Sequence, residues 1–217
     1  MLRKVFATLG AACALACTAA GAATVNITVT DAKGIPAPNT VVSVASDSST
    51  IPMPPRTPER SIIDQRHETF IPLVIVVRKG GDVVFTNNDT TTHQVYSFSP
   101  IKQFQFEIDK GQVSKPVAFD KTGVAAIGCN IHDNMVAYVF VADAPYAVVT
   151  DANGHAEIHD VPEGGYRATA WHPQLRPGKQ SMPVDFAVSG SGARLALTLP
   201  IAVMAMPSMS HMHKSDY

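Results

Sequence analysis

Residues 122–141 read TGVAAIGCNIHDNMVAYVFV, and the chemistry of this stretch decides the fold. Cys129, His132 and Met135 stand three residues apart, between two apolar runs that predict strands. One short loop would therefore bring a thiolate, an imidazole and a thioether together, a soft set of donors that suits copper better than zinc, magnesium or calcium. His93 is the candidate fourth ligand, because a neighbouring strand can bring its imidazole alongside the loop.

Two other interpretations of these residues stay open. A zinc site would draw its ligands from Cys129, His132, His93 and either Asp133 or Asp89. Such a site would leave Met135 without a role, and closed zinc sites usually contain more thiolates. Without any metal, a cysteine or a methionine between two strands would be an ordinary core residue.

The composition indicates a folded chain with a hydrophobic core. The 217 residues are 46% hydrophobic and 16% charged, which is not the composition of a disordered chain. A formal net charge of −1 argues against nucleic acid as a partner. Sixteen Pro and fourteen Gly residues, with many Val and Thr, favour short strands and turns over long helices.

The first 22 residues have the pattern of a cleavable signal peptide, with a basic start, an apolar stretch and small residues before position 23. We therefore expect a periplasmic or secreted protein. Removing Arg3 and Lys4 leaves 15 basic against 18 acidic residues, a net charge of −3, and Cys129 becomes the only thiol. In an oxidising compartment a single cysteine is open to oxidation, so we expect Cys129 to be buried or to ligate a metal. No later apolar run approaches the length of a membrane span.

Short strand patterns separated by turns occupy most of the remaining chain. They are expected at 24–30, 41–44, 70–77, 83–87, 93–98, 104–108, 117–119, on both sides of the cysteine loop, and at 146–149, 156–158, 166–171, 184–188 and 195–201. Turns about every ten residues predict antiparallel β-sandwiches and an all-β fold. The Ser- and Pro-rich segment 47–58 is expected to be a linker, and the Met- and His-rich segment 203–217 a flexible tail.

The stretch around the cysteine resembles the copper loop of the cupredoxins, the small blue copper proteins. The two-residue gap between His132 and Met135 is similar to the short loop of amicyanin, and residues 81–93, GDVVFTNNDTTTH, resemble the strand that leads to the first histidine ligand. The resemblance implies a Greek-key β-sandwich over residues 49–143. It also implies one type 1 copper held by His93, Cys129, His132 and an axial Met135.

Three positions depart from the cupredoxin pattern. Gln94 follows His93 where many cupredoxins have an asparagine that braces the loop, and Asn130 follows Cys129 where serine or threonine is usual. Ile127 replaces a customary aromatic residue. The wider pattern of this region is similar to exported proteins labelled methylamine-utilisation proteins, a label that implies little about function.

The flanks of this unit resemble a second type of domain. Residues 148–170, and the segment VNITVTDAKGIPAPNTVVSV at 25–44, are similar to the transthyretin-like, carboxypeptidase-regulatory type of small β-sandwich. One interpretation is a discontinuous sandwich of 24–48 plus 144–202 with the cupredoxin unit inserted between its parts. The other makes 24–48 an extra strand pair of the cupredoxin. A five-residue motif, Thr-Asp-Ala-x-Gly, occurs at 30–34 and again at 150–154.

Three functions are considered for such a chain. The first is an exported carrier of single electrons that has no small-molecule substrate. Its redox partners would dock transiently near His132, where Asp133 would favour a basic partner. The second is copper storage or delivery, with the tail as a copper-acquiring arm; a non-redox adhesion module is a third. An enzyme is not expected, because a multicopper oxidase or nitrite reductase needs a second copper site and the only His-x-His pair lies in the tail.

The other histidines, His67, His155, His159 and His172, are interpreted as surface or turn residues.

Overall fold

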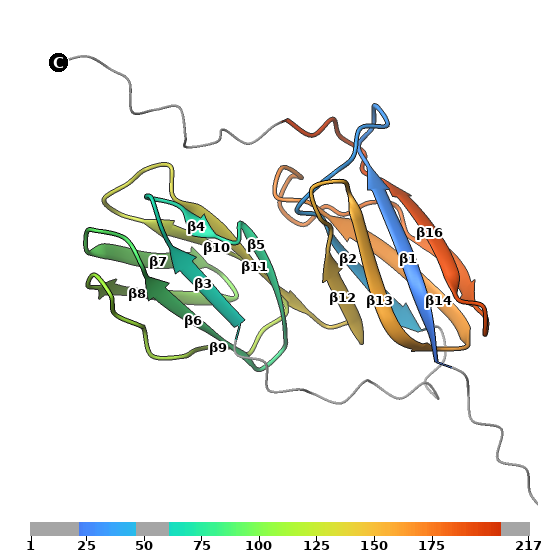
Figure 1. Cartoon of the computed structure of the whole chain (residues 1–217), viewed down its shortest axis with the longest axis horizontal. Coiled ribbons are helices and arrows are strands. Elements are labelled where there is room, and N and C mark those ends of the chain that lie inside the picture. The colour runs from blue at the N-terminus through green and yellow to red at the C-terminus, as the bar shows by residue number, and fades with distance from the viewer. Residues whose placement is uncertain (1–21, 47–60, 205–217) are drawn as a thin grey trace, which may run out of the picture.

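The computed structural model describes residues 22–46 and 61–204, and every regular element in these ranges is a β-strand. The prediction of an all-β fold is confirmed. Figure 1 shows two bodies side by side, one built from β3–β11 and the other from β1, β2 and β12–β16. All but the last residue of the expected signal peptide, the whole linker and nearly all of the tail lie outside the described residues. Within these ranges there is no helix long and apolar enough to span a membrane.

The first body consists of two sheets packed face to face. One sheet has the order β5-β11-β10-β7-β8 and the other β4-β3-β6-β9. The strands are β3 (Ser61–Gln65), β4 (Phe70–Ile71), β5 (Val74–Arg78), β6 (Gly81–Asn87), β7 (His93–Ser99), β8 (Lys102–Ile108), β9 (Val117–Phe119), β10 (Gly123–Cys129) and β11 (Val136–Ala142). Alternate side chains of both sheets fill one core, in which Phe85, Phe119 and Ile127 are fully buried.

The apolar run 70–77 forms two strands where the sequence pattern predicted one. Pro72 lies between β4 and β5, and a proline has no N–H to donate to a strand ladder. The chain uses this break to change sheets. β4 pairs with β3, whereas β5 pairs in parallel with β11.

The second body is built from strands at both ends of the described chain. Its sheets have the orders β13-β1-β16 and β12-β2-β14-β15. The strands are β1 (Ala22–Thr30), β2 (Val41–Ser46), β12 (Tyr146–Val149), β13 (His155–Pro162), β14 (Gly164–Trp171), β15 (Val184–Val188) and β16 (Ala193–Thr198). β1 thus lies between β13 and β16, and β2 lies between β12 and β14.

The repeated Thr-Asp-Ala-x-Gly motif makes the same turn twice in this body. Asp31 Oδ1 accepts the N–H groups of Lys33 and Ile35, at 2.7 and 2.9 Å. Asp151 Oδ1 accepts those of Asn153 and His155, both at 2.8 Å. The closing glycines, Gly34 and Gly154, have φ values of 79° and 73°, a left-handed conformation that glycine adopts without strain.

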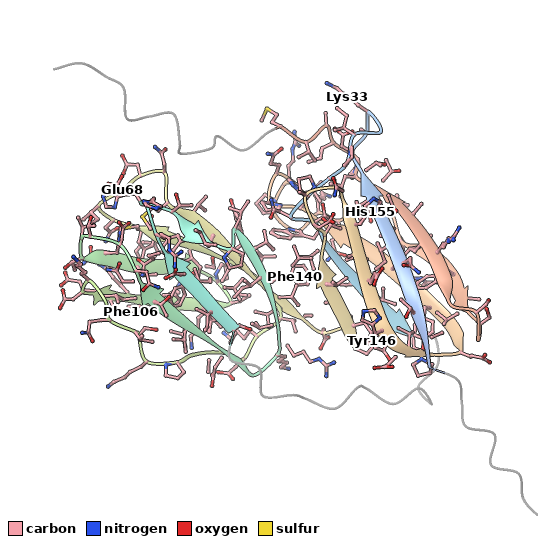
Figure 2. The ribbon with its side chains drawn as sticks, in the orientation of Figure 1. Lys33, Glu68, Phe106, Phe140, Tyr146 and His155 are labelled. Carbon is pink, nitrogen blue, oxygen red and sulfur yellow. The ribbon has the colours of Figure 1, made fainter. Side chains whose placement is uncertain are left out.

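Aromatic side chains join the two bodies. Trp171 of β14 packs against Tyr138 and Phe140 of β11, with ring centroids 5.8 and 5.6 Å away. Phe140 lies between the bodies in Figure 2 and is buried in the core of the second body together with Val74 and Ala142. The strand that follows the cysteine loop is therefore packed on one face by its own body and on the other by the second body.

His172 begins a turn, because its carbonyl accepts the N–H of Leu175 at 2.9 Å, but it is buried, so of the surface and turn interpretations only the turn is correct. Its Nδ1 accepts the N–H of Gln174 at 3.1 Å, and the ring also hydrogen-bonds to the backbone of Pro38. Burial lowers the pKa of His172 below its ordinary value of 6.5, against the opposing effect of the Pro38 bond. A neutral ring accepts a hydrogen bond through Nδ1, whereas a protonated ring cannot.

We expect this imidazole to make the protein less stable in mild acid. With a folded-state pKa below 6.5, the unfolded chain binds the proton more readily, so stability is complete above pH 6.5 and falls as the pH drops through that value. The melting temperature should decline from pH 8 to pH 5, by about 2–4 °C for each kcal/mol lost. His172→Gln, which cannot be protonated, should show a smaller decline; an equal decline in both proteins would contradict the assignment.

Candidate metal centre

Strand register brings His93 and Cys129 together. β7 and β10 are antiparallel neighbours in which Cys129 stands opposite Val95. Side chains two residues apart on a strand share a face, so His93 lies on the same face as Val95 and Cys129, diagonally across from the cysteine. β7 begins at His93 and β10 ends at Cys129, so both side chains lie at one end of the sheet.

The six-residue loop 130–135 between β10 and β11 supplies the other two side chains. A turn closed by the Met135 N–H on the His132 carbonyl, at 3.1 Å, folds the loop back over the end of the sheet. His132 is directed toward Cys129, while Met135 is buried in the same core cluster as the cysteine. His132 is more accessible than His93 or Cys129, with 21% of its side chain exposed.

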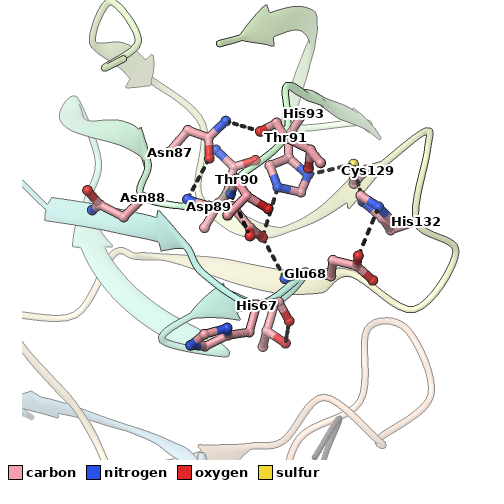
Figure 3. Close-up of polar contacts among 12 residues, drawn as sticks. His67, Glu68, Asn87, Asn88, Asp89, Thr90, Thr91, His93, Cys129 and His132 are labelled. Atoms are coloured by element: carbon pink, nitrogen blue, oxygen red, sulfur yellow. Dashed lines mark hydrogen bonds and ion pairs between the residues drawn. The ribbon is translucent and has the colours of Figure 1, made fainter. Parts of the chain in front are cut away.

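Three of the four predicted ligands form one compact group. The Cys129 Sγ lies 3.6 Å from His93 Nδ1 and 4.0 Å from His132 Nδ1, and these three atoms all lie within 4.8 Å of one another (Figure 3). His93 is fully buried and Cys129 nearly so. Both imidazoles therefore direct Nδ1 at the sulfur, which is an arrangement that could hold a metal ion. The axial role of Met135 stays a prediction.

The identity and placement of the donors distinguish copper from zinc. Two imidazoles and one thiolate with a nearby thioether are the ligands of blue copper sites. The carboxylates that zinc would need do not join this group: Asp133 is exposed on the loop, and Asp89 contacts the outer nitrogen, Nε2, of His93 at 3.2 Å. Among the described residues the donors thus fit copper better than zinc.

The loop before His93 is held by a buried asparagine. The Asn87 side chain donates to the carbonyls of Thr91 and Ile108, both at 2.8 Å, and accepts the N–H of Asp89 at 2.9 Å. Burial raises the pKa of Asp89, but hydrogen bonds from the N–H groups of Glu68 and Thr90 and from the His93 ring together lower it below its ordinary value. Asp89 is therefore an ionised acceptor for the outer nitrogen of His93.

The two departures from the cupredoxin pattern next to the ligands contact each other. The Asn130 amide donates to the Gln94 side-chain oxygen at 2.5 Å, and the Asn130 N–H donates to the Gln94 carbonyl at 3.1 Å. Gln94 follows His93 and Asn130 follows Cys129, so this pair ties the two ligand-bearing segments together. The two hydrogen bonds of this pair thus brace the loop at the place where many cupredoxins use an asparagine.

Sequence reasoning missed one residue of the site. Glu68, in the turn between β3 and β4, places its Oε1 3.6 Å from His132 Nε2. Glu68 and His132 are 64 positions apart, and no spacing pattern in the sequence connects them. The residue could have been found only through the pairing of β3 with β4, which places the turn beside the loop that carries Asp89.

No family model and no curated protein matches the chain. Among solved structures, a purple cupredoxin from Nitrosopumilus maritimus is 22% identical, with 38% of this chain and 99% of that chain covered and a TM-score of 0.35. A copper-containing nitrite reductase from Thermus scotoductus is 20% identical, with 39% and 23% covered and a TM-score of 0.37. Amicyanin from Paracoccus versutus is 16% identical, with 46% and 98% covered and a TM-score of 0.35. Each comparison covers less than half of this chain.

Proposed function

We propose that this protein is an exported type 1 copper protein of the cupredoxin kind that carries single electrons between redox partners and converts no substrate. The observation that supports this proposal is the convergence of His93 Nδ1, Cys129 Sγ and His132 Nδ1 within 4.8 Å at the end of a sandwich. In this proposal Met135 is the axial ligand. Copper held there would supply a one-electron Cu(II)/Cu(I) couple.

The chain contributes burial and rigidity to such a site. The thiol of Cys129 is enclosed in the core, where water and oxidants have little access. His93 is fixed by Asp89, and the two ligand-bearing segments are tied by the Gln94–Asn130 pair. Donors that are held in place change little when the charge of the site changes, which is what fast electron transfer requires.

The surface over His132 is the proposed docking site for partners. His132 is the most exposed of the three donors, and its neighbour Ile131 is 54% exposed. Asp133, next in sequence, is exposed as well. An apolar contact beside a carboxylate suits a transient partner that presents a basic residue.

The decisive experiment is a copper titration of the metal-free protein. We expect one equivalent of Cu(II) to produce an intense visible thiolate-to-copper band, which reduction bleaches and reoxidation restores. A colourless protein that takes up zinc in preference to copper would contradict the proposal.

Copper storage or delivery is the second candidate, because residues 205–217 contain three methionines, whose thioethers select Cu(I), and two histidines, which also bind copper. The same titration, repeated with Cu(I) on a chain ending at Met204, separates the two functions. One copper per chain, unchanged by the truncation, is expected for a carrier. Several Cu(I) ions that are lost on truncation would favour delivery. Met204 is kept because it exchanges two hydrogen bonds with the Gln174 side chain.

For the organisation of the chain, we propose a transthyretin-like sandwich of 24–48 and 144–202 that carries the copper unit, 49–143, as an insertion. The pairing of β1 with β13 and β16, and of β2 with β12 and β14, supports this division. The alternative, in which 24–48 adds a strand pair to the copper unit, has no such pairing among the described strands.

A further inference from the structure

The turn between β3 and β4 has an unfavourable backbone for its sequence. Arg66 and Thr69 exchange both backbone hydrogen bonds, at 3.0 and 3.1 Å, and enclose His67 and Glu68 with φ values of 51° and 53°. Two consecutive left-handed residues define a type I′ hairpin turn, in which Asn-Gly is the usual pair. Residues with larger side chains hold this conformation only when other contacts impose it, and such places cluster at functional sites.

Asp89 supplies one contact that holds the turn in place. One carboxylate oxygen, Oδ2, accepts the N–H of Glu68 at 2.7 Å and lies 3.2 Å from Nε2 of His93. The other oxygen accepts the N–H of Thr90 at 2.8 Å. The backbone of the turn is thus fastened to the same carboxylate that holds the first histidine.

This fastening directs the Glu68 carboxylate at the second histidine. Figure 3 shows Glu68 beneath His132, with Oε1 3.6 Å from Nε2. Each imidazole therefore has Nδ1 toward the sulfur of Cys129 and Nε2 toward a carboxylate. A carboxylate at Nε2 favours the tautomer with the proton on that nitrogen, which leaves the Nδ1 lone pair free for a metal.

We propose that Glu68 and Asp89 form a linked pair of carboxylates that fixes the tautomer and orientation of both histidines, with Glu68 as the positioning residue for His132. This inference rests on the proposed function, since it assigns the two Nδ1 atoms to a bound copper. The pair works as one unit, because the backbone N–H of Glu68 is held by Asp89. His132, on a loop and partly exposed, depends on it more than His93 does, because His93 is enclosed by the core.

The alternative to a positioning role is that Glu68 is an ordinary surface carboxylate that happens to lie near His132. Its side chain is 45% exposed, and ion pairs at such positions contribute little to folding stability. The two hypotheses predict different results for a substitution of Glu68. Loss of an ordinary surface carboxylate changes neither the orientation of the His132 ring nor the retention of the metal. Loss of a positioning residue changes both and leaves the melting temperature nearly unchanged.

Two variants test the proposal, with one matched control. Glu68→Gln keeps the size of the side chain and removes its charge. Glu68→Gly removes the carboxylate and suits the backbone, since glycine accepts a φ of 53° without strain. Glu163→Gln changes an exposed glutamate in the connection between β13 and β14, in the other body, and is the control.

The first measurement is the ¹⁵N NMR spectrum of the His132 ring in the metal-free protein at pH 8. We expect the Nε2–H tautomer in the wild type and in the control, and a mixture of tautomers in both Glu68 variants. The second is the rate at which Cu(I) passes to a chelator, which should rise about 10–100-fold in the Glu68 variants, as for other lost partners of metal-bound histidines. The control should release Cu(I) at the wild-type rate.

Unchanged tautomers and unchanged release rates in both Glu68 variants would overturn this inference and leave the proposed function intact, provided that the wild type develops its visible band. A wild type that binds copper without that band would overturn the proposed function instead. In that case the NMR measurement, which uses no metal, still decides whether Glu68 orients His132.

Discussion

Gly154→Ala is expected to destabilise the second body by about 2–5 kcal/mol. Alanine is strained at a φ of 73°, which costs roughly 1–2 kcal/mol. A methyl group at this position would also collide with the carbonyl oxygen of Val29 and lie 3.0 Å from the N atom of Ala37. Overpacking of this kind costs typically 1–3 kcal/mol, and β1 cannot move away, because it is paired on both edges.

The repeated turn provides the control for this prediction. Gly34 closes the same turn at a φ of 79°, but nothing lies within 4 Å of the position that its Cβ would occupy. Gly34→Ala should therefore cost only the backbone strain, about 1–2 kcal/mol. Urea unfolding followed by the fluorescence of Trp171, the single tryptophan and a residue of the same body, measures both variants. Equal losses would show that packing around Gly154 does not matter.

Cys129→Ser is expected to abolish the visible band and to weaken Cu(I) binding by more than about 100-fold. The hydroxyl of serine stays protonated and is a hard donor, whereas Cu(I) selects thiolates and thioethers. Residues that only support a metal ligand are worth 10–100-fold in affinity, so the loss of the thiolate itself should exceed that range. Absorbance on Cu(II) addition and competition with a Cu(I) chelator give the two readouts.

Met135→Leu is the companion variant, because leucine has a similar volume and methionine-to-leucine exchanges in a core usually cost less than about 1.5 kcal/mol. It should keep the band and change its position and the reduction potential, since a weak axial ligand tunes the site without holding it. A visible band in Cys129→Ser would contradict the role of the thiolate as the source of the band. A colourless Met135→Leu protein would contradict the role of Met135 as a weak axial ligand.

Local patterns predicted most of the fold. Alternating Val, Ile and Phe residues located most of the strands within a few residues, because one buried face and one exposed face impose a period of two; β3 was not among them. Which strands pair is decided by contacts between distant segments, and sequence left the partners of 24–48 open. The repeated Asp-Ala-x-Gly turn shows the same division: its hydrogen bonds are local and follow from five residues, whereas the crowding of Gly154 comes from β1.

The same distinction applies to the metal centre. Cys129, His132 and Met135 could be predicted because one loop carries them, and His93 because of the strand that leads to it. Glu68 and Asp89 could not be assigned to the outer nitrogens, because these contacts depend on how a turn of one sheet meets a loop of the other. Asp89 was considered as a zinc ligand, but it faces the opposite side of the His93 ring from the sulfur.

The parallel pairing of β1 with β16 has a consequence for how the chain folds. Val25 lies beside Ala193, so the ladder joins positions 168 residues apart. Contacts of such long range form slowly, because the entropy of closing the loop is lost before the contact forms. Prior folding of residues 61–142 would shorten the effective loop by drawing the ends of that segment into a compact unit. One edge of β1 would then stay unpaired until β16 has been synthesised, and substitutions that slow folding of residues 61–142 would prolong the exposure of the backbone N–H and C=O groups along that edge.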